Sequence, residues 1–443
     1  MTKLFQILDI LSAKDRKKFR ELITTSLLGG KPKHIAMYDQ LCKSKSIDNI
    51  SVDDRLIQSD LYKMIEKYIV IQKAASDEMY SGQKLLAAFR IKENQKLFDT
   101  LLNKETEKNN QSPNTEYGAL LAYEKWKFDL LKSRFTNVEI DTIVSLSDRA
   151  LILQKLKLSV NLASQSTLIK KDQNFGLLSS VLKYIEDQQL FLFDDIGLYY
   201  YCWQMMNFTK EQEWFEKFDK LFKKVSHLIA EEEKSTLYFQ GINFCIRRYN
   251  NGEKEYGHIL MKYYIEGLDN GYLLLSGWLS RNTYRNICTV AIRLQRLDDA
   301  KKVTTSYRDL LRQDDRESAY HFNLANIAFA EKHYDDALIS LQKVNFDDHL
   351  SNLFAKTLLL KIYFESGEIR LLDSHLDAMQ VYLLRQKIVG YHKTNYDKMI
   401  KYTKKILKLN PYDKESKEKL RQDISKEASI PDKEWLMHQV SIV

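Results

Sequence analysis

Apolar side chains recur at helical spacing along the chain, and residues 320–344 show this pattern most clearly. Phe322, Leu324, Ala325 and Ala328 form one apolar face, and after a polar break at 331–333 a second face contains Tyr334, Ala337, Leu338, Leu341 and Val344. Spacings of three and four predict two amphipathic helices joined by a short turn. Ala325 and Ala337 are small, so we expect the two helices to cross most closely there.

The same pattern recurs upstream with cysteine in the first small position. Cys202, Cys245 and Cys288 precede Ala325 at intervals of 43, 43 and 37 residues. Periods of this length are typical of stacked helix pairs. The cysteines have no neighbours at metal-ligand spacing, so we interpret them as packing residues. Twelve positions after them stand Trp214, Gly257 and Ala300.

The repeat is weaker at its two ends. Trp214 is large for a crossing point and predicts a wider crossing or a different register. Leu360 and Leu372 take the two positions in a divergent unit, and a last helix pair is expected over 383–408, before Pro411.

The N-terminal half has helical patterns without a repeat that can be registered. Leu4, Ile7, Leu8 and Leu11 mark one face of a first helix. Further helices are expected over 56–75, 117–132, 139–158 and 175–189, with a polar segment at 43–53 and a surface loop at 104–114. This half is either a helical bundle of its own or a set of degenerate repeats.

Composition supports an all-α fold. The chain has only 4 Pro and 14 Gly in 443 residues, and this scarcity favours long helices over turns and strands. We therefore expect an N-terminal helical bundle over 1–110, a helical region over 111–193, repeats over 194–411, and a capping helix with a tail over 412–443.

The repeat unit resembles the tetratricopeptide repeat (TPR). Residues 334–337, Tyr-Asp-Asp-Ala, are similar to the second-helix signature of that family, although its early aromatic is represented only by Tyr320 or His321 and its terminal proline is absent. The resemblance covers about residues 194–411. The layout is also similar to bacterial TPR proteins of unassigned function, through residues 15–19 and 433–436. This resemblance implies an α-α superhelix, a TPR-like solenoid, and brings no catalytic activity.

Positive charge is concentrated at the two ends of the chain. The formal net charge is +8; residues 1–35 hold eight Lys/Arg and three Asp/Glu, and residues 391–426 hold eleven and five. A solenoid that binds nucleic acid along its length is expected to carry positive charge on its repeats. The nearly neutral middle of this chain makes nucleic acid the second choice of partner. The basic C-terminal run is either a solvated helix face or a dock for an acidic partner.

No arrangement of residues predicts catalysis. Residues 29–31, Gly-Gly-Lys, lack the spacing of a phosphate-binding loop, and the chain has no HExxH or GxSxG motif. We therefore expect no enzyme, no cofactor and no metal site. No apolar run is long enough to span a membrane, and Asp9 interrupts the first apolar stretch, so we expect a cytoplasmic protein without a membrane partner.

Candidate binding residues follow from the repeat register. TPR arrays usually bind extended segments on the side lined by their first helices, which predicts Trp203, Tyr249, Arg285, Asn326 and Phe329 as inward positions. Asn243, Asn286 and Asn323 share one position in three units, and a row of amides suits the backbone of a bound peptide. Alternatively, the asparagines face solvent or cap loops, and the aromatics form the core between repeats.

The leading hypothesis is a non-enzymatic scaffold or adaptor that binds a partner segment on its concave face. The alternatives are a nucleic-acid-binding repeat protein that uses its basic ends, and a regulator that responds to a peptide. Residues 1–80 lack a helix-turn-helix pattern, which argues against a transcriptional regulator. The oligomeric state and the identity of the partner do not follow from the sequence.

Overall fold

The computed structural model describes residues 3–43, 52–111, 113–132, 137–166, 174–385, 391–427 and 429–443. Within these ranges the chain forms 22 α-helices, and its only strands are two that pair in one short hairpin. The prediction of an all-α protein is therefore confirmed. Among the helices in these ranges, none combines the length and the apolar character that crossing a bilayer requires.

The chain divides into two compact units. Unit 1 contains Met1–Ser159 and Phe175–Leu190, and unit 2 contains Val160–Asn174 and Phe191–Val443. The four ranges expected from the sequence stay a prediction, because this division follows other boundaries.

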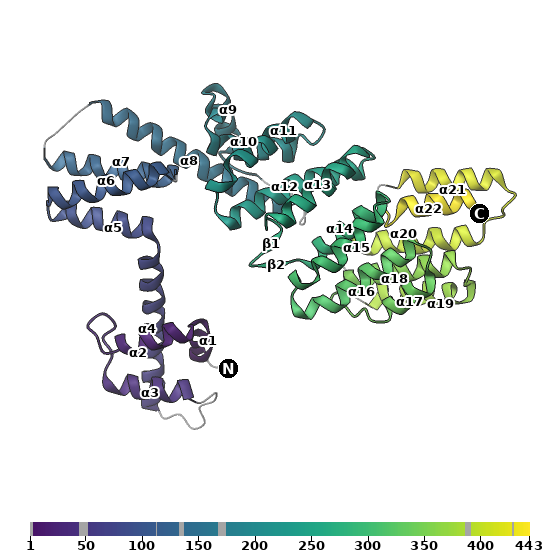
Figure 1. The fold of residues 1–443 in the computed structure, drawn as a ribbon, viewed down its shortest axis with the longest axis horizontal. Helices are drawn as coiled ribbons and strands as arrows, with labels where there is room; N and C mark the ends of the chain where they lie inside the picture. Colours follow the sequence, from purple (N-terminus) through teal and green to yellow (C-terminus); the bar gives the residue numbers. More distant parts are fainter. Residues whose placement is uncertain are drawn as a thin grey trace. The chain divides into compact units, whose positions relative to one another are not determined.

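Unit 1 consists of nine consecutive α-helices within the described residues (Figure 1). They are α1 Lys3–Ile10, α2 Ala13–Leu22, α3 Pro32–Lys43, α4 Val52–Ser76, α5 Glu78–Ile91, α6 Gln95–Gln111, α7 Thr115–Leu131, α8 Asn137–Ser166, whose end belongs to unit 2, and α9 Leu178–Asp187. The short 3-10 helix η1, Leu190–Leu192, follows. The helices expected over 56–75, 117–132, 139–158 and 175–189 correspond to α4, α7, α8 and α9. Most of the polar segment at 43–53 lies outside the described residues.

The core of unit 1 forms around aromatic side chains. Phe19 is fully buried and meets Tyr38 and Tyr68 edge to face, with ring centroids 5.1 and 5.4 Å apart. The predicted apolar face of α1 packs into this same cluster. A second cluster surrounds Phe98 and Phe128, whose rings stack with centroids 4.3 Å apart.

The surface loop expected over 104–114 is wrong for most of its length. Helix α6 continues to Gln111, and Glu105 in this polar stretch is buried. The polar composition of the stretch does not indicate this buried residue. The carboxylate of Glu105 is buried and accepts a hydrogen bond from the Tyr117 hydroxyl at 2.8 Å. Asn114 then caps α7 by accepting from the Tyr117 backbone N–H.

Unit 2 continues with thirteen α-helices in the described ranges. They are α10 Asp194–Asn207, α11 Gln212–Val225, α12 Glu231–Asn250, α13 Glu255–Asp269, α14 Arg281–Arg293, α15 Leu297–Ser306, α16 Gln313–Ala330, α17 Tyr334–Leu341, α18 His349–Glu365, α19 Ile369–Arg385, α20 Tyr391–Leu407, α21 Lys414–Lys426 and α22 Lys433–Ile442. Short connections contain η2 Ser226–Leu228, η3 Arg308–Leu310, and strands β1 Leu274–Leu275 and β2 Trp278–Leu279.

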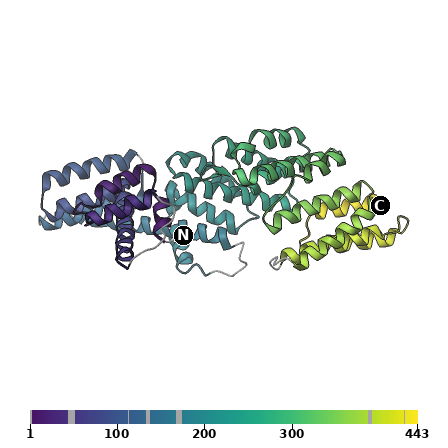
Figure 2. The same cartoon turned by 90° about the horizontal axis from the view of Figure 1, so that it is seen from below.

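Helices of unit 2 pack as consecutive antiparallel pairs (Figures 1 and 2). The pairs are α10/α11, α12/α13, α14/α15, α16/α17 and α18/α19. Some first helices of successive pairs also touch, namely α10 with α12, α14 with α16, and α16 with α18, whereas α14 packs on α13. This arrangement brings one face of several first helices to a common surface.

The small residues of the repeat lie where the sequence places them. Cys202, Cys245, Cys288 and Ala325 are at most 1% exposed, and Ala300 and Ala337 are fully buried. A Cβ atom on Gly257 would lie 2.7 Å from the Tyr249 ring and 2.9 Å from Leu294. Burial raises the pKa of Cys245 and Cys288 to about 12, so these thiols are neutral. The packing interpretation of the three cysteines is confirmed.

The C-terminal part of unit 2 differs from expectation. In place of a helix pair over 383–408, α19 extends to Arg385 and one helix, α20, follows. Residues 412–443 form two helices, α21 and α22, where one capping helix and a tail were expected. Asp432 precedes α22 with left-handed backbone angles, φ 48° and ψ 41°. Helix α22 has only 10 residues, and polar residues precede it. So short an apolar pattern does not distinguish a helix from a tail.

Candidate functional site

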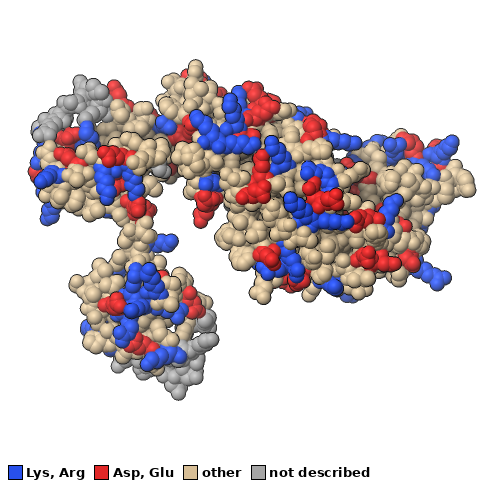
Figure 3. All heavy atoms as spheres, viewed as in Figure 1, with Lys and Arg blue, Asp and Glu red and all other residues tan. Residues whose placement is uncertain are grey.

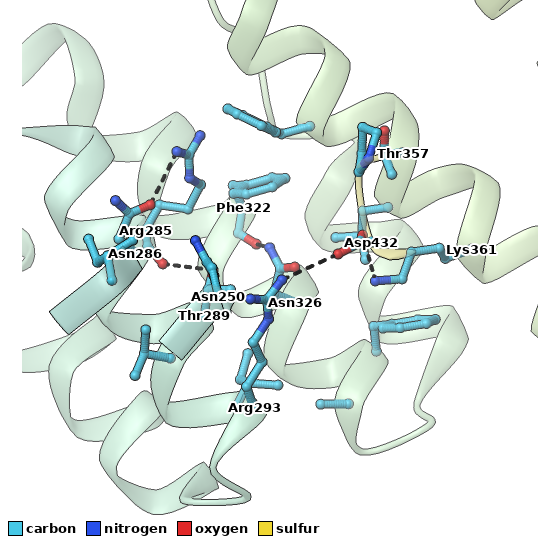
Figure 4. A pocket seen from close by; sticks show the side chains of 18 of the residues that line it. Asn250, Arg285, Asn286, Thr289, Arg293, Phe322, Asn326, Thr357, Lys361 and Asp432 are labelled. Carbon is cyan, nitrogen blue, oxygen red and sulfur yellow. Dashed lines mark hydrogen bonds and ion pairs between the residues drawn. The ribbon is translucent and has the colours of Figure 1, made fainter. Parts of the chain in front are cut away.

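The first helices of unit 2 border a cavity of about 570 Å³. This volume is within the range of about 300–1,000 Å³ typical of ligand sites. The wall includes Tyr249 of α12; Arg285, Asn286, Thr289, Ile292 and Arg293 of α14; Phe322, Asn326 and Phe329 of α16; Phe354, Thr357 and Lys361 of α18; Tyr396 of α20; and Pro431 and Asp432 before α22. Figure 4 shows how the polar side chains of these helices lie around the cavity.

Arg285 is the polar group with the most unusual surroundings. Its guanidinium lies over the Phe354 ring, with the central carbon 3.8 Å from the ring centroid, a distance suited to a cation–π contact. Its Nη2 donates a hydrogen bond to Asn286 Oδ1 at 3.2 Å. Burial lowers the pKa of Arg285, yet a guanidinium keeps its proton in a protein. A partly buried positive charge is therefore held in the cavity wall.

Asp348 attracts the positive charge of Arg285, but its carboxylate already has other hydrogen-bond partners. Asp348 accepts from Arg281 Nη2 at 2.8 Å and from the Ser351 backbone N–H at 2.9 Å. Within the described part of the chain, no carboxylate oxygen lies within 4.0 Å of the Arg285 guanidinium. The charge of Arg285 has no direct ion-pair partner there.

The opposite side of the cavity contains a second charged group. Asp432 accepts from Lys361 Nζ at 3.0 Å, and Arg293 Nη2 lies 3.8 Å from its other oxygen. Burial alone would raise the pKa of Asp432, but Lys361 and then Arg293 outweigh it and leave the pKa below its ordinary value. Among the residues that line the cavity, three cations therefore face one carboxylate.

Other polar side chains are held by their own helices. Asn326 Nδ2 donates to the Phe322 carbonyl at 2.9 Å, and Thr289 Oγ1 donates to the Arg285 carbonyl at 2.9 Å. Phe322 and Phe354 supply apolar surface beside them, and Lys361 Nζ lies 4.9 Å from the Phe329 ring centroid. The cavity thus combines fixed polar groups with aromatic walls, a composition common in ligand sites.

Five of the eight residues nominated from the sequence meet in this cavity. Tyr249, Arg285, Asn286, Asn326 and Phe329 all line it. The other three do not. Asn243 is exposed and outside the wall, Trp203 is 8% exposed within the α10 core, and Asn323 is 1% exposed.

The three asparagines of the shared repeat position do not form a row of equivalent amides. Asn323 Nδ2 donates to the Tyr284 carbonyl at 3.4 Å, because α16 packs directly against α14 at that point. Asn243 is exposed, and Asn286 alone borders the cavity. The predicted inward residues Arg285, Asn326 and Phe329 all line the cavity, whereas only one of the three asparagines does.

The sequence did not predict the side of the cavity formed by α18, α20 and the loop before α22. Lys361 and Asp432 are 71 residues apart and belong to segments without a clear repeat. Asp432 has a left-handed backbone conformation that glycine would ordinarily signal. No local spacing connects these residues, so only the packing of distant helices brings them together.

Within the described ranges, no three His, Cys, Asp or Glu side chains are arranged to hold a metal ion.

No protein-family model matches the chain, and no curated protein or solved structure matches it. The cavity geometry is therefore the main basis for a functional assignment.

Proposed function

We propose that this protein is a non-enzymatic scaffold or adaptor, a TPR-like solenoid, that binds a peptide segment of a partner protein in the cavity of unit 2. The observation that carries the proposal is the composition of the cavity wall. Neighbouring faces of α12, α14, α16 and α18 line one cavity, and α14 and α16 contribute the inward positions that the repeat register nominates. A repeat protein that buries each unit only against its neighbours can present such a surface.

The side chains of the wall suit a peptide. Its amides and hydroxyls, together with Arg285, can pair with backbone groups, each of which has a donor and an acceptor. The rings of Phe322, Phe329 and Phe354 offer apolar contact to side chains of the same segment. Fixed polar groups would orient the segment, and burial of apolar area would supply affinity.

The basic ends of the chain favour nucleic acid as a second candidate, but part of their charge is compensated within the protein. Lys398 pairs with Glu427 at 2.6 Å, and Lys404 pairs with Asp377 at 2.7 Å. On the face seen in Figure 3, Lys and Arg are interspersed with Asp and Glu over unit 2. Over unit 2, a continuous basic tract, the usual footprint of nucleic-acid binding, is not visible on that face.

Blocking the cavity tests the proposal. Ala330 lines the cavity at the end of α16, and an Ala330→Trp side chain would occupy part of it. Ala378 is exposed on α19 outside the wall, so Ala378→Trp is a matched control. We expect Ala330→Trp to lower the affinity of fluorescent hexapeptide pools and of partners captured from the native host, and Ala378→Trp to leave both unchanged.

The same samples test the second candidate with fluorescent single-stranded RNA and duplex DNA. Nucleic-acid binding that falls steeply with salt and is unaffected by Ala330→Trp, together with no peptide binding, would replace the proposal. Circular dichroism of both variants shows whether the helices are kept.

A further inference from the structure

We propose that two copies of this chain associate through α8 of unit 1, with the two helices antiparallel and Leu151 on the two-fold axis. This inference goes beyond the proposed peptide binding and does not depend on it. Helix α8, Asn137–Ser166, lies outside the residues that resemble the tetratricopeptide repeat.

The first argument is that α8 has apolar side chains on two opposite faces. One face is at most 7% exposed and packs within the chain; its central members are Ile152, Leu153 and Leu156. On the other face, Val144, Leu151 and Leu158 are 53%, 64% and 52% exposed. A helix that is apolar on both sides is ordinarily buried on both sides, so the exposed face indicates an interaction surface.

This exposed face borders a groove between α8 and α9. The groove has a volume of about 860 Å³, and its wall includes Leu151 and Leu158 of α8 together with Leu177 and Tyr184 of α9. Leu177 is 74% exposed and Tyr184 is 45% exposed. A helix of a second copy would remove these side chains from water, and their burial would drive the association.

The second argument is the spacing of the exposed apolar residues. Val144 and Leu158 each lie seven residues from Leu151, which is close to two helical turns, so the three side chains form one straight stripe. When two such stripes run antiparallel with Leu151 opposite Leu151, Val144 of each copy lies opposite Leu158 of the other. The stripe is therefore complementary to itself, as a two-fold symmetric interface requires.

The third argument is the charge beside this stripe. Asp148 and Lys155 lie on the same side of it, three residues before and four residues after Leu151. Within the described residues, neither side chain has an ion pair in the single chain. The antiparallel alignment brings Asp148 of each copy beside Lys155 of the other, whereas a parallel alignment would place like charges level with each other. This charge complementarity favours a second copy in the antiparallel direction.

Sedimentation velocity of the full-length protein over a range of concentrations measures the association. We expect a monomer–dimer equilibrium that Leu151→Asp abolishes, because two carboxylates would meet on the axis in an apolar contact. Leu130→Asp on α7 is the matched control, since Leu130 is 43% exposed and lies outside the groove. Circular dichroism shows whether both variants keep their helices.

Charge reversal distinguishes a second copy from a different partner. Asp148→Lys and Lys155→Asp should each weaken the dimer about tenfold, because each change brings like charges together at both pairs. The double variant should restore the dimer, since both members of each pair are then exchanged. A different protein bound to this face would not regain its affinity in the double variant.

Disulfide formation tests the position of the axis. Cys42→Ser removes the exposed cysteine of the chain and leaves the three buried ones. In that background, oxidised glutathione should convert Leu151→Cys to a covalent dimer, because this residue lies opposite itself. Ser145→Cys, exposed on a different side of α8, should stay monomeric under the same conditions.

Three results would overturn the inference. They are a monomer at every concentration, a dimer that survives Leu151→Asp, and a dimer that stays weakened in the double charge variant. None of them bears on peptide binding in unit 2, which Ala330→Trp tests separately.

Discussion

The helix pairs α10/α11 and α16/α17 differ in a way that explains where the repeat pattern succeeds. In α16/α17, Ala325 and Ala337 are both fully buried at the crossing. In α10/α11, Cys202 is buried, but Trp214 twelve positions later is only half-buried, and the buried residue is its neighbour Phe215. The first small position is common to the two pairs, whereas the second is shifted.

The connections between the helices account for this shift. Residues 331–333 join α16 to α17, and Lys332 there has a left-handed conformation with φ 62°. The Lys332 N–H binds the Phe329 carbonyl and the His333 N–H binds the Ala328 carbonyl, a pattern that ends a helix tightly. The α10/α11 connection, residues 208–211, is longer and has no left-handed residue. One added residue moves the following helix by about 100° of rotation, enough to replace Trp214 by Phe215 in the contact.

The same tight turn recurs in other pairs. It is centred on Gly252 between α12 and α13, on Gln295 between α14 and α15, and on Gly367 between α18 and α19. In unit 1, Glu93 between α5 and α6 has the same conformation and the same hydrogen bonds. Turns of this kind end many helices in unrelated folds, so the N-terminal half stays open as either a bundle of its own or a set of degenerate repeats.

Exchanging the residue types of Ala337 in α17 and Trp214 in α11 should have the largest effect on the free energy of unfolding. Ala337→Trp places in α17 the residue that α11 carries, and we expect a loss of about 3 kcal/mol or more, because the fully buried crossing has no room for an indole. Trp214→Ala should cost less, about 1 kcal/mol, since the ring is half-buried. Thermal unfolding of both variants measures the difference. Equal losses would mean that the two positions are equivalent after all.

A second exchange compares two asparagines of the same repeat position. Asn323→Ala should destabilise the protein by about 1–2 kcal/mol, because it removes a buried hydrogen bond to the Tyr284 carbonyl. Asn286→Ala should weaken peptide binding, because Asn286 borders the cavity, and should cost less stability than Asn323→Ala, because the Asn286 side chain is only half-buried. Urea unfolding and peptide anisotropy separate these effects. Weaker binding in Asn323→Ala at unchanged stability would contradict the assigned roles.

These two comparisons also show how much of the molecule follows from the sequence. Helical periodicity predicts the all-α fold, most helices, and the cavity faces of α14 and α16, because local spacing determines which side of a helix is buried. It does not predict Asn323 as a core residue, since that depends on how closely α16 approaches α14. It also misses Lys361 and Asp432, which meet only through distant packing.

The ion pair of Asp432 should produce a smaller, pH-dependent effect. The pKa of Asp432 is lowered in the folded protein, so its contribution is present above the ordinary pKa of about 3.9 and is lost as the pH falls through the lower folded value. Asp432→Asn should therefore cost about 1 kcal/mol at pH 7 and little at pH 2 to 3. Melting temperatures measured from pH 2 to 7 test this. A loss of the same size at every pH would show that the charge is not involved.

The smallest effect is expected in the tight turn of α16/α17. Lys332→Gly removes the cost of a left-handed lysine and should stabilise unit 2 by at most about 1 kcal/mol, because glycine also loses more entropy on folding. Gly367→Ala in the corresponding turn of α18/α19 should destabilise it by a similar amount. Thermal melts of the pair compare the two turns directly. Destabilisation by Lys332→Gly would indicate that the lysine side chain, rather than its backbone conformation, matters in this turn.

Photo-crosslinking of a bound peptide tests most directly whether the cavity is the ligand site. Benzoylphenylalanine would replace Phe329 in the cavity wall and, as the control, Tyr412, which is 91% exposed between α20 and α21. With the tightest-binding hexapeptide pool, we predict a crosslink from position 329 that excess unlabelled peptide abolishes, and none from position 412. Crosslinking from position 412 alone, with saturable binding and none from position 329, would contradict the account.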